Sequence, residues 1–392
     1  MKIKKLEYPY PFKAWFALSN DPDHTTIDRW EKLHALIWEE LQLPFADSIF
    51  TFSHNQHLPE QISLDKFGSQ LLKHPYDTLH SWGDFRHAGN MCFSRNDALA
   101  AVDKVKSFGI HPLVWTDHSV FVGNFAHHSS FGSIPYTKDA AGYSYKNQKY
   151  SLDLACKMGI RYMWDGKLTP VVGQRGRSMG MSKFKLWLAE NTGKFYSKLF
   201  SNISYTIDVN WDLNEKLYKR VKMLDGHELY FFRRYGSWRS ADIDGFGQLL
   251  TSKMLNNLMK RNGACIMYTH LGKNEVSKAG EGYEIPLQTI EALKLLKSYY
   301  LRKDINLSPV SELLDYSVIR DNMVVDNKMG TIRFNADGLR YSRLLRNDLR
   351  HRVFSYTGQL DTHTVNVVVD DVQVDWYSVD QIDSDTFTLT FI

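Results

Sequence analysis

The stretch AWFALSNDPDHTT, residues 14–26, joins an apolar run to a group of acids. The apolar residues 14–18 predict a buried strand. Asp21 and Asp23 follow it, two residues apart, with His24 directly after. Asn, Asp and Pro are common in turns, and the threonines that follow can cap a helix. The same acids also suit a metal or acid–base site at the end of a strand, so both interpretations start from this stretch.

Apolar runs and amphipathic segments alternate along the chain after this point. The predicted strands are 14–19, 49–53, one ending near 79, 112–116, 160–164 and 264–270, and the predicted helices are 26–41, 64–74, 94–109, 151–159, 241–263 and 287–303. Repeated strand–helix alternation is typical of parallel strands covered by helices. A count of about seven strands suits a closed or nearly closed α/β barrel.

Two regions interrupt this alternation. Residues 173–227 are irregular and aromatic-rich, and we interpret them as an insertion in a barrel domain of residues 1–325. From 326 to 392 the helices give way to short alternating strands such as TVNVVVDDVQVDWYSV. This pattern predicts a small β-rich C-terminal domain.

Composition narrows the function classes. The 392 residues are 43% hydrophobic and 14% aromatic, enough for a large core, and the net charge is +4 without a polybasic stripe, so nucleic acid is not expected as a partner. Three separated cysteines favour neither a disulfide framework nor a thiolate zinc site. No apolar stretch reaches the roughly 18 residues of a membrane span. We expect a cytoplasmic protein without a signal peptide, whose oligomeric state the sequence does not specify.

Asp and His side chains follow four of the predicted strands. Besides the acids at 21 and 23, these are His80 and Asp84 in LHSWGDFRH, Asp117 and His118 in WTDHS, and His270 in YTHLGK. In a parallel barrel, catalytic groups gather where strands end. One such strand end would be unremarkable, but four favour a functional site.

These residue types suit a divalent metal ion such as zinc, which takes Asp and His ligands and keeps a position for water. Asp23 and His80 are the first candidates for ligands, and Asp84 is four residues from His80. The metal would lower the pKa of its bound water. Asp21 could then act as base and His270 could protonate the leaving group. Each also has a structural interpretation, such as a turn cap, a surface ion pair or a bond to a backbone carbonyl.

The chain resembles the polysaccharide deacetylase superfamily over roughly residues 10–320. SNDPD stands where that family has an Asp pair, which implies Asp21 as base and Asp23 as metal ligand. HSWGD is similar to its His-[Ser/Thr]-x-x-His metal motif at His80 and Ser81, and MYTHLGK to its late segment with the general acid, here His270. The resemblance implies a distorted (β/α)7-type barrel and hydrolytic deacetylation of an N- or O-acetylated carbohydrate.

The sequence departs from the family's pattern at three points. Pro22 separates the two aspartates, and Asp84 occupies the position of the second metal-binding His, with His87 as an alternative ligand. The mid-chain Arg motif that holds the base is not found, and VWTDHSVFVGN stands in its place. An outlying branch of the superfamily fits these differences.

Two other function classes remain open. A glycoside hydrolase would use Asp21 and Asp117 as paired carboxylates, about 5 Å apart if retaining and about 6.5–9.5 Å apart if inverting. A catalytically silent protein would only bind a glycan. For the substrate contacts we expect Trp82, Asp117 and His118.

Overall fold

The structure is a computed structural model that describes residues 3–85, 93–117, 150–175, 211–223, 225–237, 242–274, 283–327, 331–334, 349–358 and 365–392. Its largest sheet has the strand order β12-β2-β11-β10-β8-β7-β5-β3, and each neighbouring pair is parallel. The strands are β2 (Ala14–Asn20), β3 (Asp47–Ile49), β5 (Tyr76–His80), β7 (Val114–Thr116), β8 (Tyr162–Thr169), β10 (Glu228–Tyr235), β11 (Ala264–Thr269) and β12 (Ile305–Ser308). A ninth strand, β9 (Lys219–Lys222), pairs antiparallel with β10. The expected α/β fold with a parallel sheet is confirmed.

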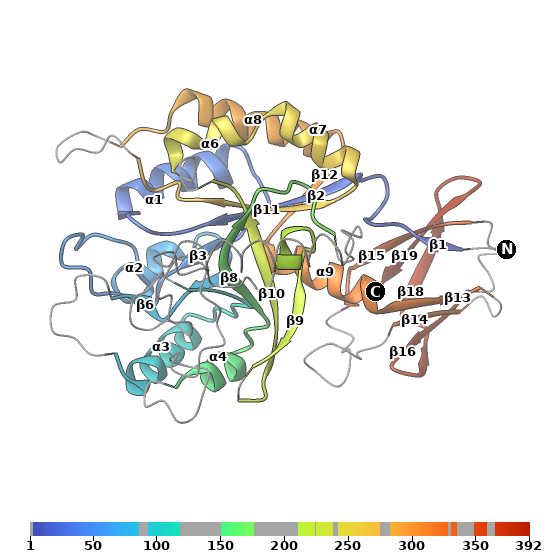
Figure 1. The fold of residues 1–392 in the computed structure, drawn as a ribbon, viewed down its shortest axis with the longest axis horizontal. Helices are drawn as coiled ribbons and strands as arrows, with labels where there is room; N and C mark the ends of the chain where they lie inside the picture. Colours follow the sequence, from blue (N-terminus) through green and yellow to red (C-terminus); the bar gives the residue numbers. More distant parts are fainter. Residues whose placement is uncertain are drawn as a thin grey trace, which may run out of the picture.

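The parallel sheet curls into a half-barrel (Figure 1). Asn20 at the end of β2 donates from Nδ2 to Asp47 Oδ1 of β3 at 3.1 Å, and Ser48 Oγ donates to the Asn20 carbonyl. Side-chain bonds therefore connect β2, near one end of the strand order, with β3 at the other. The sheet has eight parallel strands, where the sequence predicted about seven.

Helices cover the sheet in two groups (Figure 1). Around β2, β11 and β12 lie α1 (Ile27–His34), the π-helical turn η1 (Ala35–Glu40), α6 (Ile243–Leu249), α7 (Ser252–Arg261) and α8 (Leu287–Leu301). Around β5, β7 and β8 lie α2 (Leu64–Leu71), α3 (Arg95–Ser107) and α4 (Leu152–Met158). Each group shares a continuous core of buried apolar side chains with its strands, which is what holds the outer layer on the sheet.

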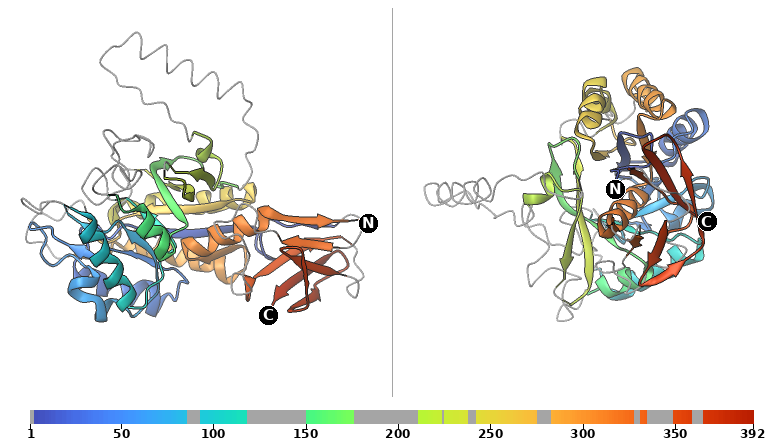
Figure 2. Two further views of the ribbon diagram at one scale, coloured as in Figure 1. Left: turned by 90° about the horizontal axis from the view of Figure 1, so that it is seen from below. Right: turned by 90° about the vertical axis from the view of Figure 1, so that its right-hand side faces the viewer.

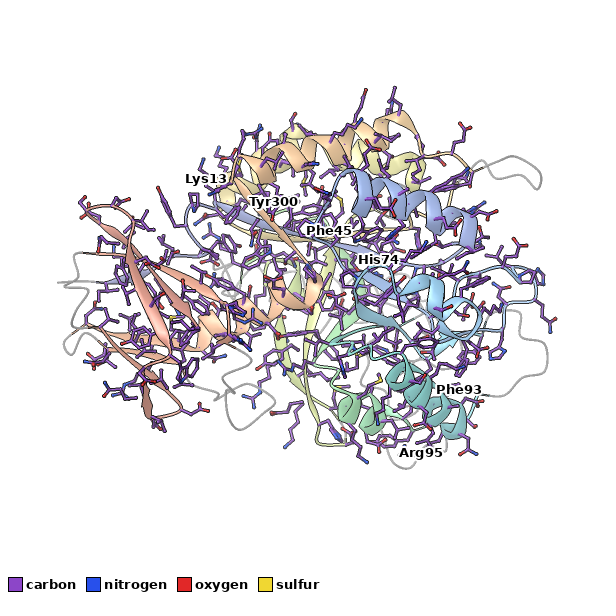
Figure 3. All side chains as sticks on the ribbon, turned by 180° about the vertical axis from the view of Figure 1, so that it is seen from behind. Lys13, Phe45, His74, Phe93, Arg95 and Tyr300 are labelled. Atoms are coloured by element: carbon purple, nitrogen blue, oxygen red, sulfur yellow. The ribbon has the colours of Figure 1, made fainter. Side chains whose placement is uncertain are left out.

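Capping side chains set several helix boundaries. Ser94 and Asp97 form a capping box at the start of α3, and Arg95, labelled in Figure 3, pairs with Asp153 of α4 at 2.7 Å. The single helix predicted over 241–263 is two helices. Leu250 leaves the helical region, and Thr251 Oγ1 accepts from Met254 N at 3.2 Å to cap α7.

The helix α9 (Val310–Asn322) lies at the amino-terminal ends of the strands. Near the start of β5, Asp77 Oδ2 accepts from Ser311 N at 2.8 Å. At the first residue of β8, the Tyr162 hydroxyl donates to Asp315. Trp15 of β2 packs on Tyr316 with ring centroids 4.8 Å apart. α9 therefore covers the end of the half-barrel opposite to the carboxyl ends of the strands.

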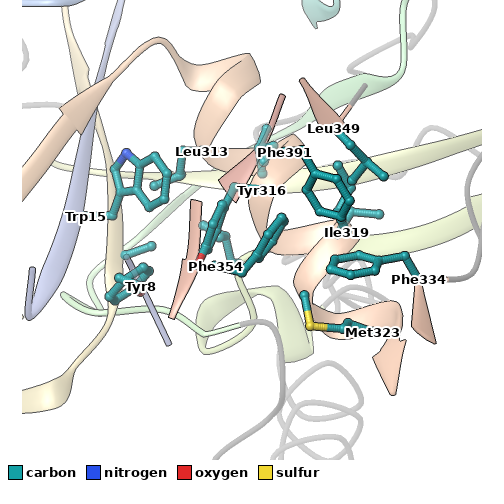
Figure 4. Close-up of a cluster of buried hydrophobic side chains, with 14 of the residues drawn as sticks. Tyr8, Trp15, Leu313, Tyr316, Ile319, Met323, Phe334, Leu349, Phe354 and Phe391 are labelled. Atoms are coloured by element: carbon teal, nitrogen blue, oxygen red, sulfur yellow. The ribbon is translucent and has the colours of Figure 1, made fainter. Parts of the chain in front are cut away.

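Two four-stranded sheets follow α9 (Figure 2). One contains β13 (Met323–Asp326), β14 (Thr331–Phe334), β16 (Asn366–Val369) and β17 (Val372–Val374), and the other contains β1 (Lys4–Lys5), β15 (Val353–Thr357), β19 (Thr386–Phe391) and β18 (Tyr377–Gln381). Phe334 of the first sheet contacts Phe354 and Phe391 of the second, with centroids 5.3 and 4.9 Å apart (Figure 4). The N-terminal strand β1 thus belongs to a sheet otherwise built from the C-terminal region.

Three smaller features complete the described chain. The predicted strand 49–53 is divided between β3 and β4 (Phe52–Ser53), and β4 pairs with β6 (Gly83–Asp84) in a two-stranded sheet. Of the expected insertion at 173–227, residues 176–210 and 224 lie outside the described residues, and η2 (Trp211–Asn214) and β9 are its regular elements within them. No helix in the described part of the chain is long and apolar enough to cross a membrane.

Candidate functional site

The carboxyl ends of β2, β5, β10 and β11 bring charged side chains together. His80 is the last residue of β5, while Asp21 and His270 directly follow β2 and β11. Arg234 is the next-to-last residue of β10. Because these strands are parallel members of one sheet, their ends share one edge of the half-barrel.

Asp21 and Asp23 lie between the two histidines. His80 is 3.8 Å from Asp21 and 3.6 Å from Asp23, measured from its Nδ1 and Nε2. His270 Nε2 is 3.6 Å from Asp21 Oδ2 and 3.8 Å from Asp23 Oδ2. The structure therefore brings together four of the site residues that the sequence indicated, from three strand ends.

Arg234 holds the Asp21 carboxylate with two guanidinium nitrogens, and the Nη2–Oδ2 distance is 3.2 Å. The guanidinium carbon lies 3.7 Å from the ring centroid of Trp164 and 4.2 Å from that of Tyr268, so the cation contacts two aromatic rings. Burial acts to raise the pKa of Asp21, but Arg234, His80 and His270 outweigh it and lower that pKa below its ordinary value. Asp21 is therefore ionised and rigidly placed.

Asp242 orients the second histidine. Its Oδ1 lies 3.2 Å from His270 Nδ1, and Lys273 Nζ lies 3.0 Å from Oδ2 of the same carboxylate. Burial acts to raise the pKa of Asp242, and the bonds from His270 and Lys273 outweigh it and lower the pKa. An ionised Asp242 favours a proton on Nδ1 of His270. The other ring nitrogen, Nε2, lies 3.0 Å from the Tyr268 hydroxyl and faces the two aspartates.

Arg234 and Asp242 are not among the site residues that the sequence indicated. The resemblance puts the arginine motif at 114–124, whereas Arg234 lies in FFRRYGS on β10. Two adjacent arginines at the end of an apolar strand were the available signal. Arg233 points elsewhere and bonds Asp165 at 2.8 Å. Arg234, and not a residue of 114–124, bonds the Asp21 carboxylate in the structure.

Two residues beside the site adopt left-handed backbone conformations. His24 follows Asp23 with φ 60°, and Ser81 follows His80 with φ 53°. The His24 amide donates to Gln61 Oε1 at 3.3 Å, and the Ser81 amide donates to the Thr116 carbonyl at 2.7 Å. Non-glycine residues persist in this region only where their surroundings hold them, which is common at functional sites.

Asp84 is fully buried in a pocket of amides. Its Oδ2 accepts from Asn55 Nδ2 at 3.2 Å and from Gln61 Nε2 at 2.7 Å. Gln61 Oε1 also accepts a hydrogen bond from the His24 amide. Asp84 therefore supports the turn after Asp23 through this glutamine. β6 pairs with β4, and this pairing puts Asp84 beside the two amides. The spacing of four residues between His80 and Asp84 does not reveal it.

Trp82 and Asp117, expected to contact a substrate, are both buried. Trp82 has no exposed surface, donates to Ser151 Oγ at 3.0 Å and packs edge-on against Trp115. Asp117 is 1% exposed and accepts from Trp115 Nε1 at 2.6 Å. The structure places Trp82 in the core, because its indole packs inward beside the end of β5. His118 and the alternative ligand His87 lie outside the described residues.

The fit to a divalent metal is partial. Asp23 and His80 supply ligand types that zinc accepts, and atoms 3.6 Å apart can both bind one cation at about 2.0–2.2 Å each. Within the described ranges, however, no group of three or more His, Cys, Asp or Glu side chains could hold a metal ion. We therefore assign no chemical step to a metal.

Comparisons with known proteins add little to this geometry. No family model and no curated protein matches the chain. A search of solved structures finds the arginine decarboxylase of Paramecium bursaria Chlorella virus, whose X-ray crystal structure contains agmatine. The two chains are 10% identical over 97% of this chain and 91% of that one, with a TM-score of 0.23. A likeness at this level carries no argument about the site.

Proposed function

We propose that this chain is a hydrolase that removes an acyl group, most simply acetyl, from a carbohydrate, on a distorted barrel of the polysaccharide deacetylase kind. One observation carries the proposal. Asp21, held by Arg234, lies 3.6 Å from His270, which Asp242 orients on the neighbouring strand end. Two proton-transfer groups fixed by separate partners are what hydrolysis by general base and general acid requires.

Asp21 is the general base in this proposal. Arg234 and the two histidines keep it ionised, and it directly follows a strand end, where the catalytic groups of parallel barrels gather. It takes the proton as the oxygen of water bonds to the substrate's carbonyl carbon. The low pKa also makes Asp21 unsuited to the acid role in a glycoside hydrolase, which needs a carboxylic acid with a raised pKa.

His270 is the general acid. Its Nε2 lies on the same side as Asp21, and Asp242 holds Nδ1, so a proton on Nε2 points into the site. It returns a proton to the leaving nitrogen or oxygen as the carbonyl carbon loses that group. The products are the free sugar amine or hydroxyl and the carboxylic acid.

Asp23 and His80 are the side chains that would hold a divalent metal ion such as zinc, and that ion would lower the pKa of a bound water and stabilise the oxyanion. The metal stays a prediction of the sequence. Elemental analysis of the purified protein tests it directly. Asp23→Ala and His80→Ala should lose any stoichiometric metal, whereas Asp84→Asn, which changes the amide pocket, should keep it.

Acetate release tests the function. We expect the wild-type protein to release acetate from at least one member of a panel of N-acetylated chitooligosaccharides and O-acetylated xylans. Asp21→Asn should keep the fold and lose about 10²–10⁴-fold in turnover, because an amide cannot take the proton. Release of reducing sugar without acetate would favour the glycosidase alternative. Binding without either product would favour the glycan-binding one.

A further inference from the structure

Asn20 is the last residue of β2 and directly precedes the candidate base Asp21, and it is buried, with 6% of the residue exposed. Its Nδ2 donates to Asp47 Oδ1 of β3 at 3.1 Å. Its Oδ1 accepts the backbone amide of Leu271, the residue after His270, at 2.8 Å. One amide group therefore connects the last residue of β2 with the first residue of β3 and with the turn after β11.

These two bonds act where the sheet itself stops. The last ladder contact between β2 and β11 is the Asp21 amide, which donates to the Thr269 carbonyl at 2.8 Å. Beyond it the chain turns at Pro22 on one side and at Leu271 on the other. The Asn20 side chain therefore bonds beside both turns, the one after Asp21 and the one after His270.

We propose that Asn20 is a positioning residue that sets the distance between Asp21 and His270, an inference that rests on the acid–base function proposed above. Asp47 is its anchor. Because Asn20 Nδ2 donates, Asp47 must supply only an acceptor, and both a carboxylate and a neutral carboxyl do so. Ser48 N also donates to Asp47 Oδ1, at 2.8 Å, which holds that oxygen in place.

The histidine beside Asp47 would not replace Asn20 as a donor. His74 is labelled in Figure 3. Its Nε2 lies 3.9 Å from Asp47 Oδ2, beyond hydrogen-bond distance. Burial, with His34 nearby, lowers the pKa of His74 to about 3, so its ring is neutral. Removal of the Asn20 amide therefore leaves Asp47 Oδ1 with the Ser48 amide alone and takes away the acceptor of the Leu271 amide.

The test compares four variants of the full chain. Asn20→Ala removes both bonds, Asp47→Leu removes the anchor, and Asp47→Asn keeps an acceptor oxygen at the same place. Asn256→Ala is the matched control, because it removes one asparagine bond, from Tyr299 at 3.0 Å, between the outer helices α7 and α8. Thermal unfolding checks that each variant folds. If Asn20→Ala does not fold, the comparison of Asp47→Leu with Asp47→Asn tests the positioning role instead.

We expect Asn20→Ala and Asp47→Leu to lower kcat by about 10²-fold at nearly unchanged KM for the acetylated panel, because a misplaced acid–base pair affects the chemical step more than binding. Asp47→Asn and Asn256→Ala should keep the wild-type kcat. In ¹⁵N NMR spectra of the histidine side chains, the His270 signals should move in the first two variants and stay in the other two.

The two readouts separate the inference from the function on which it rests. Moved His270 signals in a chain that releases no acetate would support the positioning role of Asn20 and reject the hydrolase. Unchanged kcat and unchanged His270 signals in a folded Asn20→Ala would overturn the inference. A loss of kcat in Asp47→Asn equal to that in Asp47→Leu would also overturn it, because the charge of Asp47 would then matter instead of its acceptor.

Discussion

At the residue scale, Asp21 depends on a cation from a strand far away in the sequence. Arg234 is 213 positions from it and has no exposed surface, and its guanidinium is enclosed by Trp164 and Tyr268. The planar guanidinium matches the carboxylate with two bonds and stacks on aromatic rings, which a lysine ammonium cannot do. This geometry explains why burial does not leave Asp21 protonated.

Arg234→Met should move the acidic side of the pH profile of kcat/KM to higher pH. Without the Arg234 cation, burial would raise the pKa of Asp21 against the two histidines alone. The Asp21–Arg234 pair also contributes stability above the ordinary carboxyl pKa of about 3.9, and this contribution is lost as the pH falls through the lowered folded-state value. Removing one partner of a buried pair costs about 3–5 kcal/mol in the free energy of unfolding. Arg234→Lys is the control, with a smaller shift. An unmoved acidic side of the pH profile in Arg234→Met would contradict the assignment of Asp21 as base.

Asp47 gives the opposite pH dependence. Burial raises its pKa to about 7, although the bonds from Ser48 and Asn20 act to lower it. Because the folded-state pKa is above the unfolded value, wild-type stability should fall as the pH rises from about 4 to 7, by about 1.4 kcal/mol for each unit between the two values. Asp47→Asn should lack this loss, so urea unfolding should find it more stable than wild type at pH 8. Parallel stability curves for the two proteins between pH 5 and 8 would contradict the raised pKa.

At the scale of elements, the turns after β2 and β11 are packed against each other. Arg29 donates from Nη1 to the carbonyls of His24 at 3.1 Å and Gly272 at 2.8 Å, so it bonds both turns. A Cβ on Gly272 would lie 2.6 Å from Cβ and 2.8 Å from Cα of Thr25, closer than real Cβ contacts. Only glycine permits this approach of the two turns.

Gly272→Ala should therefore force the turns that carry Asp23 and His270 apart. We expect a loss of about 1–3 kcal/mol in the free energy of unfolding, as for other overpacked sites, together with a lower kcat. The control is Gly226→Ala in the β9–β10 turn, where a Cβ would meet nothing within 4 Å, although its φ of +90° strains an alanine. That variant should lose stability without losing kcat. Wild-type kcat in Gly272→Ala would show that the two turns tolerate separation.

At the scale of the whole molecule, aromatic contacts join the half-barrel to the β sheets that follow it. Trp15 of β2 packs on Tyr316 of α9, and Tyr316 stacks on Phe354 of β15 with centroids 5.0 Å apart (Figure 4). Phe354 in turn contacts Phe334 and Phe391. One buried cluster therefore extends from the parallel sheet through α9 into both C-terminal sheets.

Phe354→Ala should destabilise the whole chain and not only the C-terminal sheets. The expected cost is about 3–5 kcal/mol, typical of a buried phenylalanine replaced by alanine. Because the cluster is shared, unfolding followed by tryptophan fluorescence and by far-ultraviolet circular dichroism should remain one transition at a lower temperature. Leu301→Ala, at a side chain that is 67% exposed, is the control and should change stability little. Two separated transitions in the wild-type protein would contradict a shared core.

The sequence by itself determined the features that depend on neighbouring residues. Apolar runs bounded by turn residues predict β2, β7, β8 and β11, and the acids and histidines at strand ends follow from reading where those runs stop. The alternation of strands and helices predicts a parallel sheet, and parallel strands place Asp21, His80 and His270 at one edge. The curled half-barrel is consistent with a barrel superfamily, while the deacetylase activity stays a proposal.

Only the tertiary structure decided which partners those side chains have. Arg234, Asp242 and Asn20 bond residues that are distant along the chain, so no local pattern identifies their partners. Asp84 has metal-ligand spacing from His80, yet the β4–β6 pairing directs its side chain toward the amide of Gln61. Trp82 packs into the core. Local sequence sets which backbone conformations are favoured, whereas the direction of a buried polar side chain depends on which donors and acceptors the folded chain brings within reach.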